Sequence, residues 1–174
     1  MIGIDTCHEN LIETSAKALK KPAKGGLSNL IFVLTNVENL PDDLINIADK
    51  IYINFPWGTL LQGVVAVNEL TWQNIKKICK ANATIQIIFG YNILHDKKEI
   101  DRLELPILNE AYFKNMFIPK LEKFGFNVNN IKKLMPADLK NYPTTWAKKL
   151  SFGSDRDYYL VELKIARQII KNIL

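Results

Sequence analysis

Cysteine and histidine are scarce in this sequence. The 174 residues include two cysteines and two histidines. Cys7 and Cys79 lie far apart and outside any Cys-x-x-Cys spacing, which argues against a zinc site and against a redox motif. We therefore expect no bound metal and two buried, unpaired thiols, since free cysteine behaves as a small apolar side chain.

Long apolar runs are also missing. No stretch approaches the roughly 20 consecutive apolar residues that a membrane-spanning helix needs. The first residues, Met1–Asp5, lack the basic and apolar segments of a signal peptide. We expect a cytoplasmic protein with no membrane partner.

The overall composition is that of a globular protein. Hydrophobic residues make up 48% and charged residues 24% of the chain, so disorder is not expected. No repeat or linker interrupts the sequence, and we expect one domain over residues 1–174. Lysine and arginine outnumber the acids by 23 to 18, for a net charge of +5. This excess is compatible with a nucleic-acid partner but does not establish one.

Strand-like and helix-like segments alternate along the chain. Continuous apolar runs, typical of strands covered on both faces, occur at Met1–Asp5, Asn29–Leu34, Ile51–Phe55 and Thr84–Phe89. Helices are predicted at Cys7–Lys20, Pro41–Ile47, Leu60–Val65, Thr71–Ala81 and Asn109–Phe124. A polar loop covers Asn92–Arg102, and a late strand pair is predicted at Phe126–Leu134 and Asp157–Leu163. This order predicts an α/β fold with a mainly parallel sheet and an antiparallel C-terminal hairpin.

Two acids follow the first two predicted strands. Asp5 ends the first strand, and Glu38 follows the second. An acid at the end of a strand in a nucleotide-binding βαβ unit accepts hydrogen bonds from ribose hydroxyls. A helix cap or a turn is the alternative role for Asp5. Together the two acids point to a nucleoside site, with the capping role left open.

The segment Asn54–Gly58 (NFPWG) directly follows a buried strand. Pro56 restricts the backbone, so a neighbouring carbonyl and the Trp57 indole are held in defined directions. A fixed acceptor beside an aromatic face suits a planar base with an exocyclic amine. The alternative is a tryptophan that only packs.

A second tryptophan, Trp146, begins an amphipathic turn whose polar side carries Lys148 and Lys149. A base held between two aromatic faces gains roughly 1–3 kcal/mol per stack. On its own this segment also fits a core helix with solvated lysines. Arg102 and Arg156 would add to a basic rim around the tryptophans.

A stretch whose charged residues are all lysines precedes Gly25 and Gly26. No acid lies between Thr14 and Val37, and such a patch holds phosphates in a salt-dependent way. The two glycines permit close approach of the backbone, which favours RNA over a merely solvated surface. The lysines of the stretch are Lys17, Lys20, Lys21 and Lys24.

Six segments in order resemble one known family. They are IGID, KKPAKGGLSN, VENLP, FPWGTLL, LPILNEAYF and TTWAKKLSFG, within Ile2–Tyr159. They resemble the 16S rRNA (adenine(1408)-N1)-methyltransferases that confer aminoglycoside resistance. The resemblance implies a Rossmann-like, class I fold that uses S-adenosylmethionine (SAM). The implied substrate is the decoding-site adenine of 16S rRNA in the 30S subunit, and adenine N1 attacks the methyl group without a dedicated base.

The resemblance also implies a role for particular residues. The implied SAM contacts are Asp5 at the ribose, Val37 and Glu38 by the adenine, and Asn54, Thr59 and Leu60 along the pocket. The implied clamp on the flipped adenine is Trp57 and Trp146, with the carbonyls of Phe55 and Pro56 facing its amine. The implied rRNA contacts are Lys17, Lys20, Lys21, Lys24, Arg102, Thr144, Lys149 and Arg156. Lys149 stands where relatives carry arginine, so it keeps the charge and loses the bidentate geometry.

The sequence departs from this family at its start. Family members have a strand and a glycine-rich SAM loop before the position of Asp5, whereas this sequence begins at Met1. We therefore expect two strands with an unpaired edge, a tendency towards a strand-swapped homodimer, and little or no methyl transfer. A non-catalytic rRNA-binding remnant is one alternative. A tRNA guanine-N7-type methyltransferase is another, which the absence of an acid from Phe55-Pro56-Trp57 disfavours.

Overall fold

The computed structural model describes residues 1–152 and 156–166. The chain divides into two compact units, Met1–Asp42 and Asp43–Leu174. The described strands form a two-stranded sheet in the order β1-β2 and a four-stranded sheet in the order β3-β4-β6-β5. The expectation that residues 1–174 make a single domain stays a prediction.

The first unit is a βαβ element. Strands β1 (Ile2–Asp5) and β2 (Ile31–Leu34) run parallel, with Asp5 opposite Leu34. Helix α1 (His8–Ala18) connects them, followed by the 3₁₀ turn η1 (Pro22–Lys24), and η2 (Val37–Asn39) follows β2. All residues of this unit are described, and Gly26 is the only buried one. Met1–Asp42 therefore has no apolar core of its own.

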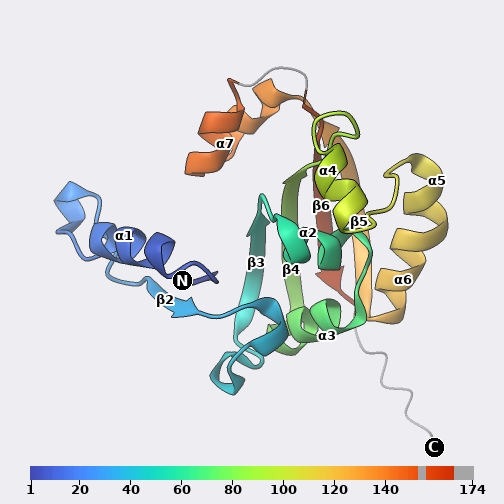
Figure 1. Ribbon diagram of the computed structural model, residues 1–174. Helices are drawn as coiled ribbons and strands as arrows, with labels where there is room; N and C mark the ends of the chain where they lie inside the picture. The colour runs from blue at the N-terminus through green and yellow to red at the C-terminus, as the bar shows by residue number, and fades with distance from the viewer. Residues whose placement is uncertain (153–155, 167–174) are drawn as a thin grey trace, which may run out of the picture. The chain divides into compact units, whose positions relative to one another are not determined.

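The second unit contains the larger sheet. Strand β3 (Ala48–Asn54) is parallel to β4 (Cys79–Gly90). Strand β6 (Tyr158–Ile165) is antiparallel both to β4 and to β5 (Phe126–Leu134). Figure 1 shows the four strands side by side in that order. The predicted parallel sheet with an antiparallel C-terminal pair is confirmed.

The core of the second unit lies between the sheet and its helices. It includes α2 (Gly58–Val65), α3 (Glu69–Ile78) and α6 (Ile118–Lys123). Trp72 of α3 is 0% exposed and meets Phe126 edge-on, with ring centroids 5.0 Å apart. Helices α2 and α3 approach so closely that a Cβ on Gly63 would lie 2.4 Å from Thr71 Oγ1. This third tryptophan is a core residue.

Three helical segments differ from the sequence-based expectation. The helix predicted at Pro41–Ile47 is only the 3₁₀ turn η3 (Asp42–Leu44), because Asn46 adopts a left-handed conformation with φ 56°. Helix α4 (Lys97–Arg102) forms inside the predicted polar loop.

The helix predicted at Asn109–Phe124 is divided. It consists of α5 (Glu110–Tyr112), a π-helical stretch η4 (Phe113–Phe117) and α6. Pro119 has no N–H to continue the α-helical bonding, and its ring clashes with the preceding turn. A wider turn before proline relieves that clash.

Strands β1 and β3 each have one neighbour among the described residues: β1 pairs with β2 and β3 pairs with β4. The edge strands β2 and β5 also have one neighbour each in the described part of the chain, so the two unpaired edges expected from the sequence stay a prediction. Helix α7 (Thr145–Leu150) and the 3₁₀ segment η5 (Pro136–Asn141) lie at the carboxyl end of β3 and β4 (Figure 1).

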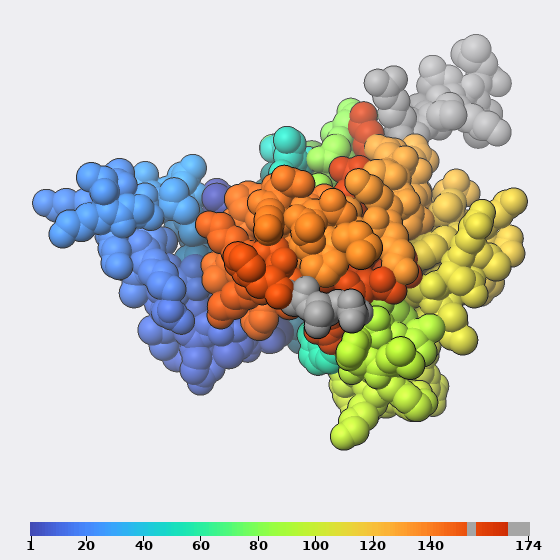
Figure 2. Space-filling model, turned by 90° about the horizontal axis from the view of Figure 1, so that it is seen from above, coloured from blue at the N-terminus to red at the C-terminus, as the bar shows by residue number. Residues whose placement is uncertain are grey.

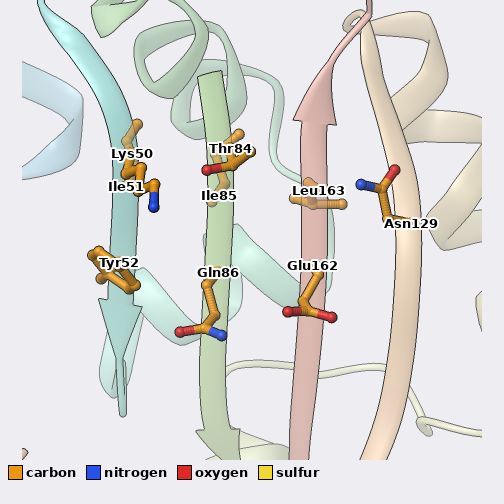
Figure 3. A pocket seen from close by; sticks show the side chains of 9 residues that line it. All are labelled: Lys50, Ile51, Tyr52, Thr84, Ile85, Gln86, Asn129, Glu162 and Leu163. Atoms are coloured by element: carbon orange, nitrogen blue, oxygen red, sulfur yellow. The ribbon is translucent and has the colours of Figure 1, made fainter. Parts of the chain in front are cut away.

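A hollow of about 320 Å³ lies on one face of the larger sheet. Figure 3 shows side chains from β3, β4, β6 and β5 around it, among them Tyr52, Gln86 and Glu162. None of the predicted site residues lines this hollow. The turn with Trp57 lies elsewhere, at the carboxyl end of β3.

Both thiols are free, but they differ in burial. Cys79 is 9% exposed, whereas Cys7 is only partly buried at the start of α1. The expectation of two buried thiols is therefore right for Cys79 and wrong for Cys7, because α1 buries none of its residues. Within the described residues, no group of three or more His, Cys, Asp or Glu side chains is placed to hold a metal ion. No described helix is long and apolar enough to cross a membrane.

The two thiols are expected to react with alkylating agents at different rates. Burial raises the pKa of Cys79 to about 11, so little thiolate is present at pH 8, and the sulfur is shielded as well. Mass spectrometry after a short iodoacetamide pulse on the native protein should find Cys7 modified and Cys79 unmodified. Equal labelling of both residues in the folded protein would contradict this burial, and urea-unfolded protein, in which both should react, is the control.

Candidate functional site

The turn between β3 and α2 carries the first exposed tryptophan. Phe55 has φ 53° and Gly58 has φ 61°, so two residues of this turn are left-handed. The left-handed region is strained for a bulky residue and costs of order 1–3 kcal/mol. The Phe55 N–H donates a hydrogen bond of 2.6 Å to the Ile88 carbonyl of β4. The turn is thereby fixed to the neighbouring strand.

The side chains of this turn differ in burial. The Phe55 ring points into the protein and meets the Tyr158 ring edge-on, with centroids 6.2 Å apart at 85°. Pro56 is buried, while Trp57 is 53% exposed. Asn54 and Thr59, on either side of the turn, are exposed, and Leu60 is partly buried in the first turn of α2. The Phe55 ring is therefore packed in the protein, and the Trp57 ring, two residues later, is exposed.

Helix α7 carries the second exposed tryptophan. Thr144 caps the helix, since its Oγ1 accepts the Ala147 N–H at 3.0 Å. Trp146 is 60% exposed and Ala147 is 0% exposed. Figure 2 looks down on this end of the sheet and shows the orange segment with η5 and α7 forming a continuous surface. Trp146 is presented on that surface while its neighbour is buried.

One small apolar cluster joins the two tryptophan-bearing segments. Its buried members come from β4, β5, β6, η5 and α7, and Phe55, Tyr142 and Leu150 pack against it. The buried members are Ile88, Leu134, Leu139, Ala147, Tyr158 and Leu160. Both exposed indoles therefore project from backbone that is anchored in the same core.

Arg156 lies beside Trp57 and is held by a buried acid. The guanidinium carbon of Arg156 is 6.0 Å from the Trp57 ring centroid, within cation–π range. A terminal guanidinium nitrogen donates to Asp96, which is only 5% exposed and also accepts the Asn92 N–H at 2.9 Å. The Nε of Arg156 is buried and has no hydrogen-bond partner among the described residues. Arg156 is therefore held beside the exposed indole by a buried acid, with 32% of its side chain exposed.

Two further predicted cations differ in their surroundings. Lys149 places Nζ 5.3 Å from the Trp146 ring centroid, so each exposed tryptophan has a cation over its ring. Arg102 instead forms two hydrogen bonds of 2.8 Å with Glu99. This pairing raises the pKa of Arg102 and lowers the pKa of Glu99. Two of the Arg102 donors are thus engaged within α4.

Asp5 is held in place at the end of β1. Its Oδ1 accepts the Cys7 N–H at 2.8 Å and its Oδ2 accepts the Asn10 amide at 3.3 Å. The predicted turn role of Asp5 is thus present. A carboxylate accepts about four hydrogen bonds, so both oxygens also keep capacity for ribose hydroxyls.

Glu38 lies in the short turn η2 together with Val37. The flanking residues fix this turn, since Thr35 Oγ1 donates to the Asn39 carbonyl at 2.8 Å and the Asn39 amide donates to Asn36 Oδ1 at 3.0 Å. The turn follows β2 directly, at the same carboxyl end of the two-stranded sheet as Asp5.

The basic stretch forms a closed loop at the end of α1. Lys17 pairs with Glu13 at 2.6 Å, whereas Lys20, Lys21 and Lys24 are exposed. Gly25 is left-handed with φ 82°, and a Cβ on Gly26 would lie 1.5 Å from the Lys20 carbonyl oxygen. The left-handed Gly25 and the tightly packed Gly26 therefore close the loop, and the close approach at Gly26 is to the chain itself.

A family model described as NpmA, 16S rRNA (adenine(1408)-N(1))-methyltransferase, matches residues 1–165. The chain belongs to this family. A 16S rRNA (adenine(1408)-N(1))-methyltransferase of Escherichia coli is 39% identical over 167 residues, which cover 95% of this chain and 76% of that protein. A relative from Streptoalloteichus tenebrarius with the same description is 24% identical. The matched region covers 90% of this chain and 71% of that protein.

Solved structures of family members have the same fold. The aminoglycoside resistance methyltransferase NpmB1 matches with a TM-score of 0.80 and 30% identity over 95% of this chain and 75% of that chain. A mutant of the 16S rRNA (adenine(1408)-N(1))-methyltransferase from Catenulisporales acidiphilia, solved with SAM, matches with a TM-score of 0.82 and 26% identity. That match covers 97% of this chain and 75% of the other. The predicted class I methyltransferase fold is confirmed.

Asp96, which holds Arg156 in this candidate site, was not identified from the sequence. It lies in a segment predicted as a polar loop, 60 residues before Arg156. The only sequence signal was an acid among the polar residues that follow a buried strand. Its burial and its pairing with Arg156 depend on the antiparallel pairing of β4 with β6, which brings Gly90 opposite Tyr158.

Replacement of Asp96 should destabilise the protein. Asp96→Asn removes the charge that balances the partly buried Arg156, and breaking such a pair leaves an uncompensated cation. Because Arg156 keeps about a third of its exposure, we expect a loss of about 1–3 kcal/mol, measured by urea unfolding. Asp101→Asn breaks the exposed Asp101–Lys97 pair and should change the unfolding free energy little. Equal effects of the two substitutions would contradict the role given to Asp96.

Proposed function

We propose that this protein transfers the methyl group of SAM to N1 of adenine 1408 of 16S rRNA in the 30S subunit, the activity for which its relatives are named. The observation that carries the proposal is the pair of exposed tryptophans, Trp57 and Trp146, anchored in one core cluster with a cation over each ring. Enzymes that act on a base take it out of its stack and hold it between aromatic or apolar side chains.

The target adenine would stack between the two indoles. Each stack contributes roughly 1–3 kcal/mol and reads no sequence. The carbonyls of Phe55 and Pro56 supply acceptors for the exocyclic amine, and the left-handed Phe55 backbone fixes their direction. As N1 becomes methylated, the adenine gains positive charge, and acceptors that are already in place stabilise that charge. N1 carries its own lone pair, so no general base is required.

The phosphates near the flipped nucleotide would be bound by Arg156, Lys149 and Thr144. Arg156 is oriented by Asp96, and 32% of its side chain is exposed. Lys149 acts as a point charge rather than a bidentate fork. The wider rRNA backbone would be contacted by Arg102 and by the basic loop with Lys17, Lys20, Lys21 and Lys24.

SAM supplies the activated methyl group when it is bound. We assign its ribose to Asp5, whose oxygens keep acceptor capacity, and its adenine to Val37 and Glu38. Asn54, Thr59 and Leu60, which surround the tryptophan turn, are proposed as further cofactor contacts. Residues 1–174 would then belong to one methyltransferase domain, located in the cytoplasm with its ribosomal substrate.

A strand-swapped homodimer is a separate proposal, supported by the unpaired edges of β1 and β3. Unpaired edges are templates for pairing with another chain. We expect sedimentation velocity to show a dimer at micromolar concentration, and a monomer at every concentration tested would rule the swap out.

Incubation of the protein with 30S subunits and SAM labelled in the methyl group tests the proposed activity directly. We expect label in 16S rRNA and a reverse-transcription stop at adenine 1408. Trp146→Ala and Trp57→Ala should each lower the rate at least about 10-fold, because one stack is lost. Tyr52→Ala removes an aromatic ring of similar exposure from the sheet face and should leave the rate unchanged.

The alternatives give different results in the same assay. Salt-dependent 30S binding without label and without a SAM-induced rise in melting temperature would identify a non-catalytic rRNA-binding protein. Label at another nucleotide would refute the assignment of the target. Absence of binding to the 30S subunit would contradict both the proposed methyltransferase activity and the non-catalytic rRNA-binding role.

A further inference from the structure

Ala147 is a buried residue of minimal size beside an exposed tryptophan. It is 0% exposed and belongs to the cluster of Leu139, Tyr158 and Ile88, while the preceding Trp146 is 60% exposed. A methyl group is all that α7 inserts into the cluster at this position. Because protein interiors are close-packed, the length of this side chain limits how near the helix backbone lies to the cluster.

The turn that carries Trp57 contacts the same cluster through Phe55. The Phe55 ring packs against the buried members and meets Tyr158 edge-on. The Tyr158 ring in turn lies over Gly90, where a Cβ would be 3.2 Å from Tyr158 Cε1 and 3.8 Å from Arg156 Cδ. Two very small residues, Ala147 and Gly90, therefore border the contact region between the two tryptophan-bearing segments.

Hydrogen bonds at both ends stabilise the short helix α7. The Ala147 N–H donates to Thr144 Oγ1 at 3.0 Å, and its carbonyl accepts the Ser151 N–H at 2.9 Å. Ser151 Oγ also donates to the Lys148 carbonyl at 2.7 Å. A displacement at Ala147 is thus transmitted to Trp146 and Lys149 on the same short helix.

We propose that Ala147 is a positioning residue whose small side chain sets the gap between Trp57 and Trp146, with Gly90 limiting the same gap from the β4 side. The proposal rests on the proposed function, in which these rings hold the target adenine. Two stacking contacts of about 3.5 Å each require ring planes about 7 Å apart. An error of 1 Å in that gap is enough to lower a rate by about 100-fold.

The proposal predicts which kinetic constant changes. Affinity for the 30S subunit comes mainly from phosphate contacts. Of the proposed contacts only Lys149 and the capping residue Thr144 belong to α7, so a change in the gap leaves most of them in place. The width of the gap determines how the flipped base is held at the step where N1 is aligned with the methyl group. Widening it should therefore lower kcat and change KM for the 30S subunit little.

Ala147→Leu is the test variant, and Ala83→Leu is its matched control. Ala83 is 2% exposed in β4 and lies outside the cluster, so both substitutions add the same group to a buried site. Ala147→Leu should lower kcat by about 10- to 100-fold and leave KM for the 30S subunit within about twofold. Addition of Leu139→Ala to Ala147→Leu removes comparable volume from the cluster and should restore kcat towards wild type.

Fluorine NMR of protein labelled with 5-fluorotryptophan provides a readout that does not need activity. Three resonances are expected, from Trp57, Trp72 and Trp146, assigned with single Trp→Phe variants. Ala147→Leu should shift the resonances of Trp57 and Trp146 and leave that of the core residue Trp72 in place. Ala83→Leu should leave the two exposed tryptophans unshifted.

Each outcome of these experiments decides the proposal. Unchanged kcat in Ala147→Leu, an equal loss in Ala83→Leu, or unshifted Trp57 and Trp146 resonances would overturn it. If Ala147→Leu does not fold, Gly90→Ala replaces it, with the same resonances shifted and a smaller loss of kcat expected. If the wild-type protein transfers no methyl group, the proposed function fails, while the fluorine spectra still decide whether Ala147 sets the gap.

Discussion

The hydrogen bond from the Phe55 N–H to the Ile88 carbonyl is the contact on which the candidate site depends. It fixes a bulky residue in a left-handed conformation directly before a proline, a combination that no isolated chain would prefer. The sheet overcomes this strain because β3 and β4 pair in parallel up to Asn54. As a result Phe55 points inward and Trp57 points outward. The stacking surface, the carbonyl direction and the contact with Arg156 all follow from that one backbone geometry.

The fold was predictable where its determinants are local. The late strand predicted at Phe126–Leu134 has the bounds of β5, and β4 and β6 are found within a few residues. The errors occur where a single backbone feature overrides composition. Asn46 is left-handed and ends the helix predicted before it, and Pro119 forces a π-helical turn into a segment that otherwise has helical periodicity. Neither effect is visible in a hydrophobic pattern.

The site was predictable to the extent that it consists of exposed aromatics and cations in distinctive segments. Trp57 and Trp146 are exposed, as a binding role requires, while Trp72 is in the core. The residues that hold them were not predictable, because their partners are distant in sequence. Asp96 meets Arg156 across 60 residues, and Ala147 meets a cluster drawn from five elements. An alanine gives no sequence signal, since its contribution is the volume that it leaves empty.

The two units differ in how far they are organised for their proposed tasks. The tryptophans and Arg156 lie in the unit whose core includes Trp72, Phe126 and the Tyr158 cluster. Asp5 and Glu38 lie in the unit where only Gly26 is buried, and some forty residues without an apolar core contribute little stability of their own. Parallel strands such as β1 and β2 are normally covered on both faces. The residues proposed to bind the base are therefore pre-organised, whereas any ligand that binds Asp5 and Glu38 also stabilises the βαβ element that carries them. Under the proposed assignment of SAM to Asp5 and Glu38, cofactor affinity and the stability of Met1–Asp42 are linked quantities.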